Sequence, residues 1–89
     1  MPHYTYIIQS QTTDTFYIGS TYNPSLRLQH HNDGWTNSTK FGIPWKLVYL
    51  EEHLTKSDAI RREYEIKRMK SHIYIERLIQ HAGGRPDAT

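Results

Sequence analysis

Cysteine and long apolar stretches are both absent from this chain of 89 residues. Without cysteine the protein can form neither disulfide bonds nor thiolate metal sites, which is typical of a reducing compartment. No apolar run approaches the roughly 18 residues that a membrane-spanning helix requires, and the N-terminal residues lack the basic and apolar regions of a signal peptide. We therefore expect a cytoplasmic protein with no membrane partner, stabilised by packing alone.

Net charge is small as well, at +2 with the six histidines counted as neutral. Five of the 11 lysines and arginines nevertheless fall within residues 61–70, namely Arg61, Arg62, Lys67, Arg68 and Lys70. On a helix they would form a basic stripe that is compatible with a nucleic-acid partner. For any single cation a solvated helix face is the simpler interpretation. The charge pattern permits a nucleic-acid partner without identifying one.

Three segments rich in aromatic and β-branched residues predict three strands, at residues 3–9, 15–19 and 45–50. The polar residues 10–14 favour an antiparallel hairpin between the first two. In a hairpin centred near Thr12, Tyr6 and Tyr17 would come within about one residue of lying directly opposite each other. If they share a face of the sheet, their side chains would be close neighbours, but the sequence does not fix the register of the hairpin.

Helix signals occur in three places: at 23–34, where Asn-Pro begins the segment and glycine ends it; from residue 55 or 57 to about 70; and from 71 to the glycine pair at 83–84. The predicted fold is α+β, with a three-stranded antiparallel sheet flanked by three helices in the order β-β-α-β-α-α. We expect residues 1–84 to form a single domain and residues 85–89 to form a loose tail.

Three polar residues stand out on the predicted helices. Arg27 and His31 are four residues apart, so they share one face of the short helix. Glu63 lies four residues after Ala59 and three before Ile66, on the face of the long helix that should meet the sheet. A carboxylate there is explained by a salt bridge with a neighbour such as Arg27, by a side chain that reaches the helix edge, or by a metal-ligand role.

Several short motifs occur in a characteristic order with these residues. Residues 4–6 read Tyr-Thr-Tyr, and residues 17–19 read Tyr-Ile-Gly. Residues 45–49 read Trp-Lys-Leu-Val-Tyr, and Ser-Asp-Ala-Ile-Arg-Arg-Glu precedes Ile-Lys within residues 57–67. Together these motifs resemble the GIY-YIG nuclease family, and more closely its small single-domain bacterial subgroup. A chance match of all these elements is harder to accept than shared ancestry.

The resemblance implies a metal-dependent endonuclease that hydrolyses phosphodiester bonds in DNA, with low sequence specificity and with one divalent cation, Mg²⁺ or Mn²⁺. Tyr6 and Tyr17 match the motif tyrosines, of which one, usually the first, helps to activate the attacking water; which of them does so here stays open. The phenol of tyrosine has a pKa of about 10, so this role requires either a lowered pKa of the tyrosine or a proton relay. Gly19 matches the motif glycine, where the missing side chain permits a close approach.

The resemblance also gives roles to the residues on the helices. Arg27 matches an arginine that holds the phosphate in the transition state, and His31 matches a histidine that shares a proton with a tyrosine or contacts the phosphate. Glu63 matches the carboxylate that binds the metal. Lys40 and Lys67 are further candidates for contact with the substrate, against the alternative that each is a solvated lysine.

This sequence differs from the family pattern in two places. The first motif has Tyr-Thr in place of Gly-Ile before its tyrosine, and residues 63–89 lack the asparagine that many members carry there. A non-catalytic module that retains the nuclease fold and binds nucleic acid, or a protein-interaction domain, is the alternative function. For a nuclease of this size we expect a partner protein or the structure of the DNA to select the target.

Overall fold

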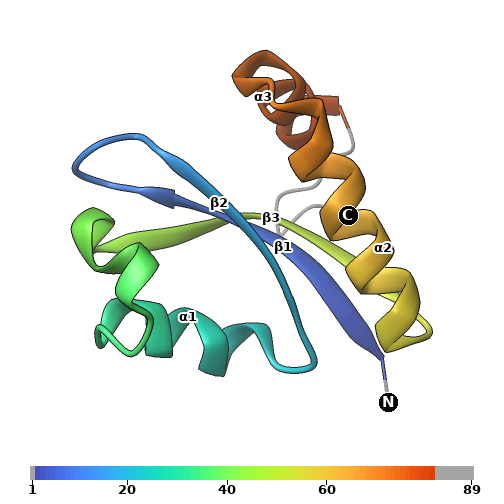
Figure 1. Ribbon diagram of the computed structural model, residues 1–89, viewed down its shortest axis with the longest axis horizontal. Coiled ribbons are helices and arrows are strands. Elements are labelled where there is room, and N and C mark those ends of the chain that lie inside the picture. The colour runs from blue at the N-terminus through green and yellow to red at the C-terminus, as the bar shows by residue number, and fades with distance from the viewer. Residues whose placement is uncertain (1, 82–89) are drawn as a thin grey trace.

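The computed structural model describes residues 2–81 and has an α+β fold with the predicted order of elements (Figure 1). Its strands are β1 (His3–Ser10), β2 (Phe16–Thr21) and β3 (Trp45–His53). Its helices are α1 (Pro24–Asn32), the 3-10 helix η1 (Asn37–Gly42), α2 (Lys56–Met69) and α3 (His72–His81). The predicted three-stranded antiparallel sheet and three α-helices are confirmed, and η1 is an addition to them. No helix within residues 2–81 is long and apolar enough to cross a membrane.

The helices begin at the predicted capping residues. Asn23, Thr55 and Ser71 each accept a hydrogen bond from the backbone N–H three residues later, at 3.1–3.2 Å. The first helix ends at Asn32, two residues before the expected stop, and Gly34 lies in the following turn with a φ of 82°. The predicted end of the last helix at 83–84 and the tail at 85–89 lie outside the described residues.

The strand order is β2-β1-β3, so β1 is the central strand. Tyr6 pairs with Gly19, and Tyr17 pairs with Ile8. The two tyrosines therefore share a face of the sheet but are offset by two residues, and the expected closer register is wrong. Asp14 adopts a left-handed conformation in the hairpin connection (φ 63°), a turn geometry that the polar sequence of this segment does not specify.

The apolar core has two layers, one on each side of the sheet, as the placement of the helices in Figure 1 illustrates. The layer next to α2 and α3 contains Ile7, Ile18, Tyr49, Ile66 and Ile75. The layer next to α1 contains Tyr6, Ile8 and Trp45, with Tyr17 and Leu28 packed against them. Because side chains alternate along a strand, β1 contributes to both layers. The motif tyrosines consequently face α1.

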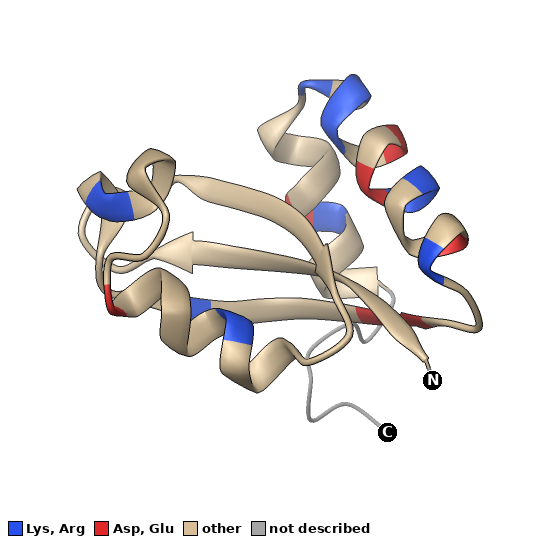
Figure 2. Ribbon diagram, turned by 60° about the horizontal axis from the view of Figure 1, so that its bottom comes forward, with Lys and Arg blue, Asp and Glu red and all other residues tan. Residues whose placement is uncertain are grey.

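Helix α2 carries charges of both signs, as Figure 2 shows. Its ion pairs along the helix are Arg61 with Asp58, Arg62 with Glu65, and Lys67 with Glu63. The predicted basic stripe is thus largely neutralised, because acids on the same helix pair with three of its cations. Positive charge remains concentrated near the end of α2, at Arg68 and Lys70.

A polar network attaches α2 to β3. The guanidinium of Arg62 donates from Nε to Oε1 of Glu51 at 3.0 Å, and the Tyr49 hydroxyl donates to Oε2 at 2.6 Å. His53 Nε2 lies 2.8 Å from Oε1 of the same carboxylate. Burial alone would raise the pKa of Glu51, but the hydrogen bond from Tyr49 and the charge of Arg62 outweigh it and lower the pKa. This network helps to fix the helix that carries Glu63.

Candidate active site

The hydroxyl of Tyr6 reaches the edge strand β2 at Gly19. Tyr6 is only 3% exposed, and a Cβ atom at position 19 would lie 2.5 Å from its Oη and 2.6 Å from its Cζ. Real Cβ atoms essentially never approach another heavy atom so closely. The space that glycine leaves is therefore occupied by the end of the Tyr6 side chain.

His31 lies beneath this hydroxyl on α1 and is fully buried. Its Nε2 is 2.8 Å from Tyr6 Oη, and its Nδ1 is 2.9 Å from Thr39 Oγ1 on η1. Burial, reinforced by the charges of Arg27 and His30, lowers the pKa of His31 to about 4. At neutral pH the imidazole is consequently neutral, and one of its ring nitrogens can accept a hydrogen bond.

Tyr17, Lys67 and Glu63 extend the cluster from β2 to α2. The Tyr17 ring meets His31 edge-on, with 5.1 Å between the ring centroids. Lys67 Nζ lies 5.9 Å from the centroid of the Tyr17 ring and 2.6 Å from Oε2 of Glu63. The Glu63 side chain is 14% exposed, so the face assigned to it from the sequence is mostly covered. The salt bridge that the sequence left open is formed with Lys67.

The pKa of the Tyr6 hydroxyl is raised to about 12, chiefly by burial. The Arg27 charge opposes this shift, whereas Tyr17 and Glu63 add to it, so all three groups act on the same hydroxyl. The resting structure therefore does not supply the lowered tyrosine pKa that one route to base catalysis requires. His31, with Nε2 2.8 Å from Tyr6 Oη, is the group through which the alternative, a proton relay, would have to run.

Lys40 is not joined to this cluster by any hydrogen bond or ion pair within the described part of the chain. Its side chain is exposed and passes the backbone of Gly34, with Cε 3.7 Å from where a Cβ atom would be. The preceding residue, Thr39, is instead fully buried and contacts His31. Sequence reasoning missed Thr39 because a threonine in a polar, glycine-containing loop gives no periodic or motif signal.

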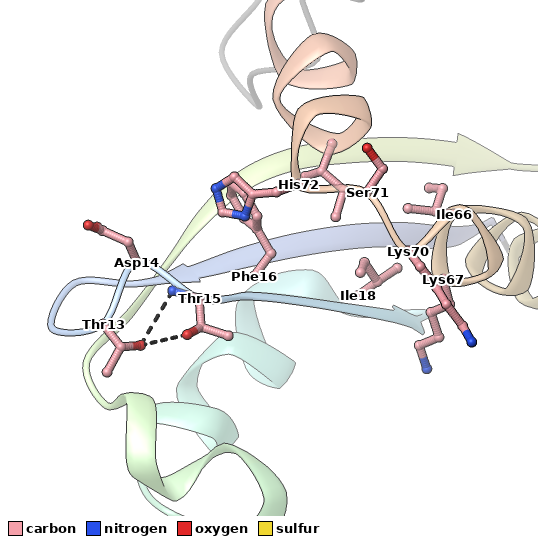
Figure 3. Close-up of a pocket in the computed structure, with 11 residues that line it drawn as sticks. Thr13, Asp14, Thr15, Phe16, Ile18, Ile66, Lys67, Lys70, Ser71 and His72 are labelled. Atoms are coloured by element: carbon pink, nitrogen blue, oxygen red, sulfur yellow. Dashed lines mark hydrogen bonds between the residues drawn. The ribbon is translucent and has the colours of Figure 1, made fainter.

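A groove of about 430 Å³ adjoins the cluster between the tip of the β1–β2 hairpin and the junction of α2 and α3 (Figure 3). We call it the hairpin groove. It is lined by Thr13, Asp14, Thr15, Phe16, Ile18, Ile66, Lys67, Lys70, Ser71, His72 and Ile75. Its lining combines apolar side chains with neutral polar ones, two lysines and one aspartate. Lys67 belongs both to this lining and to the ion pair with Glu63. Ile18, Ile66 and Ile75 in the lining belong to the core layer next to α2 and α3, so the groove lies on the opposite side of the sheet from Tyr6 and meets the cluster only at Lys67.

Comparison with protein families identifies the class to which this fold and cluster correspond. A family model described as the GIY-YIG catalytic domain matches residues 2–75. The match covers most of the chain and includes every residue of the cluster, and the protein belongs to the GIY-YIG family. The resemblance found in the sequence motifs is confirmed.

Individual relatives are small proteins of the UPF0213 group. A UPF0213 protein of Staphylococcus haemolyticus is 44% identical over 66 residues, which cover 73% of this chain and 79% of the relative. A UPF0213 protein of Staphylococcus epidermidis is 39% identical over the same shares of the two chains. The solution NMR structure of a UPF0213 protein from Bacillus halodurans is 31% identical, with a TM-score of 0.59, and the match covers 97% of this chain and 89% of that one. These names state no activity.

Proposed function

We propose that this protein is a metal-dependent endonuclease that hydrolyses phosphodiester bonds in DNA. The observation that supports this most strongly is the buried hydrogen bond between Tyr6 Oη and the neutral His31, at 2.8 Å, close to Arg27 and Glu63. A proton acceptor, a cation suited to phosphate and a carboxylate are thus assembled around one hydroxyl. Family membership makes a nuclease the natural interpretation of this arrangement.

In the proposed reaction Tyr6 and His31 handle the proton of the attacking water. As the water oxygen bonds to phosphorus, its proton passes to Tyr6 Oη while the Tyr6 proton passes to His31 Nε2. The bond to the leaving oxygen breaks, and that oxygen takes a proton from solvent. Because the two transfers are coupled, Tyr6 can act without first ionising, despite its raised pKa.

Arg27 holds the substrate phosphate in this proposal. Its guanidinium presents several donors to the phosphate oxygens and balances the charge that they gain in the transition state. In the resting protein the Arg27 charge also contributes to the low pKa of His31. A phosphate bound to Arg27 would offset that charge, so substrate binding would make His31 a stronger proton acceptor.

Glu63 is the residue that would hold the divalent cation. No group of three or more potential ligands from His, Asp and Glu occurs within residues 2–81, so Glu63 would act as a single carboxylate ligand. Such a site suits Mg²⁺, which commonly keeps several waters and binds through one or two carboxylates and the substrate phosphate. When bound, the cation would stabilise negative charge on the leaving oxygen.

The hairpin groove is the proposed path for the nucleic-acid strand that flanks the cleaved bond. Lys67 and Lys70 on its rim would contact the backbone phosphates, and Lys40 is a further proposed contact on the side of η1. Contacts from these lysines to backbone phosphates would carry no sequence information. Low sequence specificity, with selection by DNA structure or a partner protein, is consistent with this lining.

The proposal is tested by cleavage of plasmid, single-stranded and branched DNA, and of RNA, in a titration of Mg²⁺ or Mn²⁺. We expect metal-dependent cleavage of DNA and a loss of about 100-fold or more in Glu63→Gln, because this change removes the negative ligand but keeps the side-chain volume. Glu65→Gln is the matched control, since Glu65 lies on the same helix and is largely exposed. Equal cleavage by Glu63→Gln and the unchanged protein would exclude the metal role.

A non-catalytic nucleic-acid-binding module is the second candidate. It is favoured by the ion pair between Glu63 and Lys67, because the ammonium group of Lys67 balances the carboxylate charge that would otherwise attract a metal ion. Binding that weakens with salt, without metal-dependent cleavage of any substrate in the panel, would support this alternative.

A further inference from the structure

Thr39 connects His31 to the backbone of η1. Its Oγ1 lies 2.9 Å from His31 Nδ1 and 3.2 Å from the carbonyl oxygen of Thr36. Both Thr39 and His31 are fully buried, so the contact between them is shielded from water. A threonine hydroxyl carries one proton, and it can therefore donate to only one of these two neighbours.

The carbonyl of Thr36 can only accept hydrogen bonds; it accepts from the Thr39 backbone N–H at 3.1 Å, and its second lone pair is within reach of the single proton of the Thr39 hydroxyl at 3.2 Å. Oγ1 is then left to accept from Nδ1–H of His31. A neutral imidazole has one N–H group, so Nε2 must be unprotonated and accept from the Tyr6 hydroxyl at 2.8 Å. The hydrogen bonds thus all run in one direction, from Tyr6 through His31 and Thr39 to the Thr36 carbonyl.

We propose that Thr39 is a positioning residue that fixes His31 in the tautomer protonated at Nδ1, so that Nε2 is the acceptor for the Tyr6 proton. In the opposite tautomer Nε2–H would donate to Tyr6, and His31 would have no free site to receive the Tyr6 proton. We infer the tautomer from the arrangement of these hydrogen bonds, whereas its consequence for catalysis rests on the proposed function.

The position of Thr39 is itself held by Trp45 on β3. The indole Nε1 donates to the Thr39 carbonyl at 2.8 Å. The backbone of Trp45 also exchanges two hydrogen bonds with the side chain of Asn32, at 2.6 and 3.0 Å. Trp45 thus binds both η1 and the end of α1 to the same point on the sheet. These hydrogen bonds hold Thr39 and His31 at a fixed position relative to each other.

The tautomer is tested directly by the ¹⁵N chemical shifts of the His31 ring in the full chain. We expect the shift of Nε2 to be that of an unprotonated nitrogen and the shift of Nδ1 to be that of a protonated one. Thr39→Val removes the hydroxyl but keeps the side-chain shape, and it should abolish this preference, while Thr39→Ser should retain it. His31 protonated at Nε2 in the unchanged protein would overturn the proposal, even if Thr39→Val fails to fold.

The catalytic consequence is tested by cleavage across pH. Thr39→Val should lower kcat by about 10-fold or more with KM nearly unchanged, and should move the acidic limb of the profile, since a misprotonated histidine no longer serves the reaction. Thr39→Ser should restore both. The groups that also act on His31 are Arg27 and His30 on α1, Tyr6 on β1 and Tyr17 on β2, and all remain in these variants.

These two measurements separate the possible failures. If no variant cleaves any substrate but the ring shifts are as expected, the proposed function fails and the positioning role of Thr39 in the folded protein stands. If cleavage occurs and Thr39→Val has an unchanged pH profile, the positioning role in catalysis fails and the nuclease assignment stands.

Discussion

The positions of single residues in the cluster depend on close packing contacts, and Gly19 is the clearest example. The Tyr6 side chain passes directly over Gly19, and a Cβ atom at position 19 would overlap the end of the Tyr6 ring. The backbone at this position does not require glycine, because its φ is not in the left-handed region. The constraint is therefore a matter of packing.

We predict that Gly19→Ala lowers the free energy of unfolding by about 1–3 kcal/mol, the usual cost of overpacking, and displaces the Tyr6 hydroxyl from His31. Denaturant unfolding of Gly19→Ala measures this cost. The same change in a Tyr6→Leu background is the control, because the shorter side chain leaves the space above position 19 empty. An equal cost in both backgrounds would contradict the steric explanation.

The sequence predicts the identities of the cluster residues better than it predicts their chemical states. Tyr6, Tyr17 and Glu63 are found through motif order, because that order records residue types. The raised pKa of Tyr6 and the low pKa of His31 depend on burial among distant segments, which no local pattern expresses. Thr39 was missed for the same reason.

Among the elements, α2 depends on its attachment to β3. The carboxylate of Glu51 receives hydrogen bonds from both Arg62 and Tyr49, and it joins a strand to the helix that carries Glu63. Since the pKa of Glu51 is lowered in the folded protein, its contribution is present above the ordinary carboxyl pKa and is lost as the pH falls through the lower folded value.

We predict that Glu51→Gln lowers the free energy of unfolding by about 2 kcal/mol at neutral pH, because Arg62 loses its charged partner in a partly buried setting. The difference from the unchanged protein should shrink below pH ~4, as the Glu51 carboxylate itself becomes protonated. Urea unfolding at several pH values measures both effects. Glu52→Gln, which changes the exposed next residue on β3, should be nearly neutral; a constant difference across pH would contradict the ionic explanation.

Strands and helices were predicted well from the sequence because their caps and β-branched runs are local signals. The register of the hairpin was not, because it also depends on the geometry of the turn, in which Asp14 is left-handed. The helix η1 was also missed. Its position depends on Trp45, which lies outside it in the sequence and contacts it only in the folded chain.

For the molecule as a whole, a net charge of +2 leaves little general attraction for nucleic acid. Binding must then depend on a few cations placed near the cluster. Several cations of α2, Lys67 among them, are engaged with acids of the same helix. Of the two lysines that line the hairpin groove, Lys70 is therefore better placed to contact a phosphate chain.

We predict that DNA affinity without metal falls with salt and that Lys70→Ala reduces the slope of log K against log salt by about 1, the loss of one phosphate contact. Lys56→Ala is the matched control, because Lys56 lies at the opposite end of α2, away from the groove. Fluorescence anisotropy with labelled DNA at increasing KCl measures the slope. An equal slope for Lys70→Ala and the unchanged protein would remove the groove from the proposed path.

The central position of β1 has a consequence for the protein during its synthesis. This strand precedes the other described elements in the chain, yet its two neighbours are β2 and the much later β3, and Thr5 within it donates to the backbone of Ala59 at 2.8 Å. Tyr6 therefore reaches the ribosome exit long before Thr39 and Glu63. A nascent chain therefore cannot bring Tyr6, His31 and Glu63 together until α2 has left the ribosome, and assembly of the cluster is one of the last steps of folding.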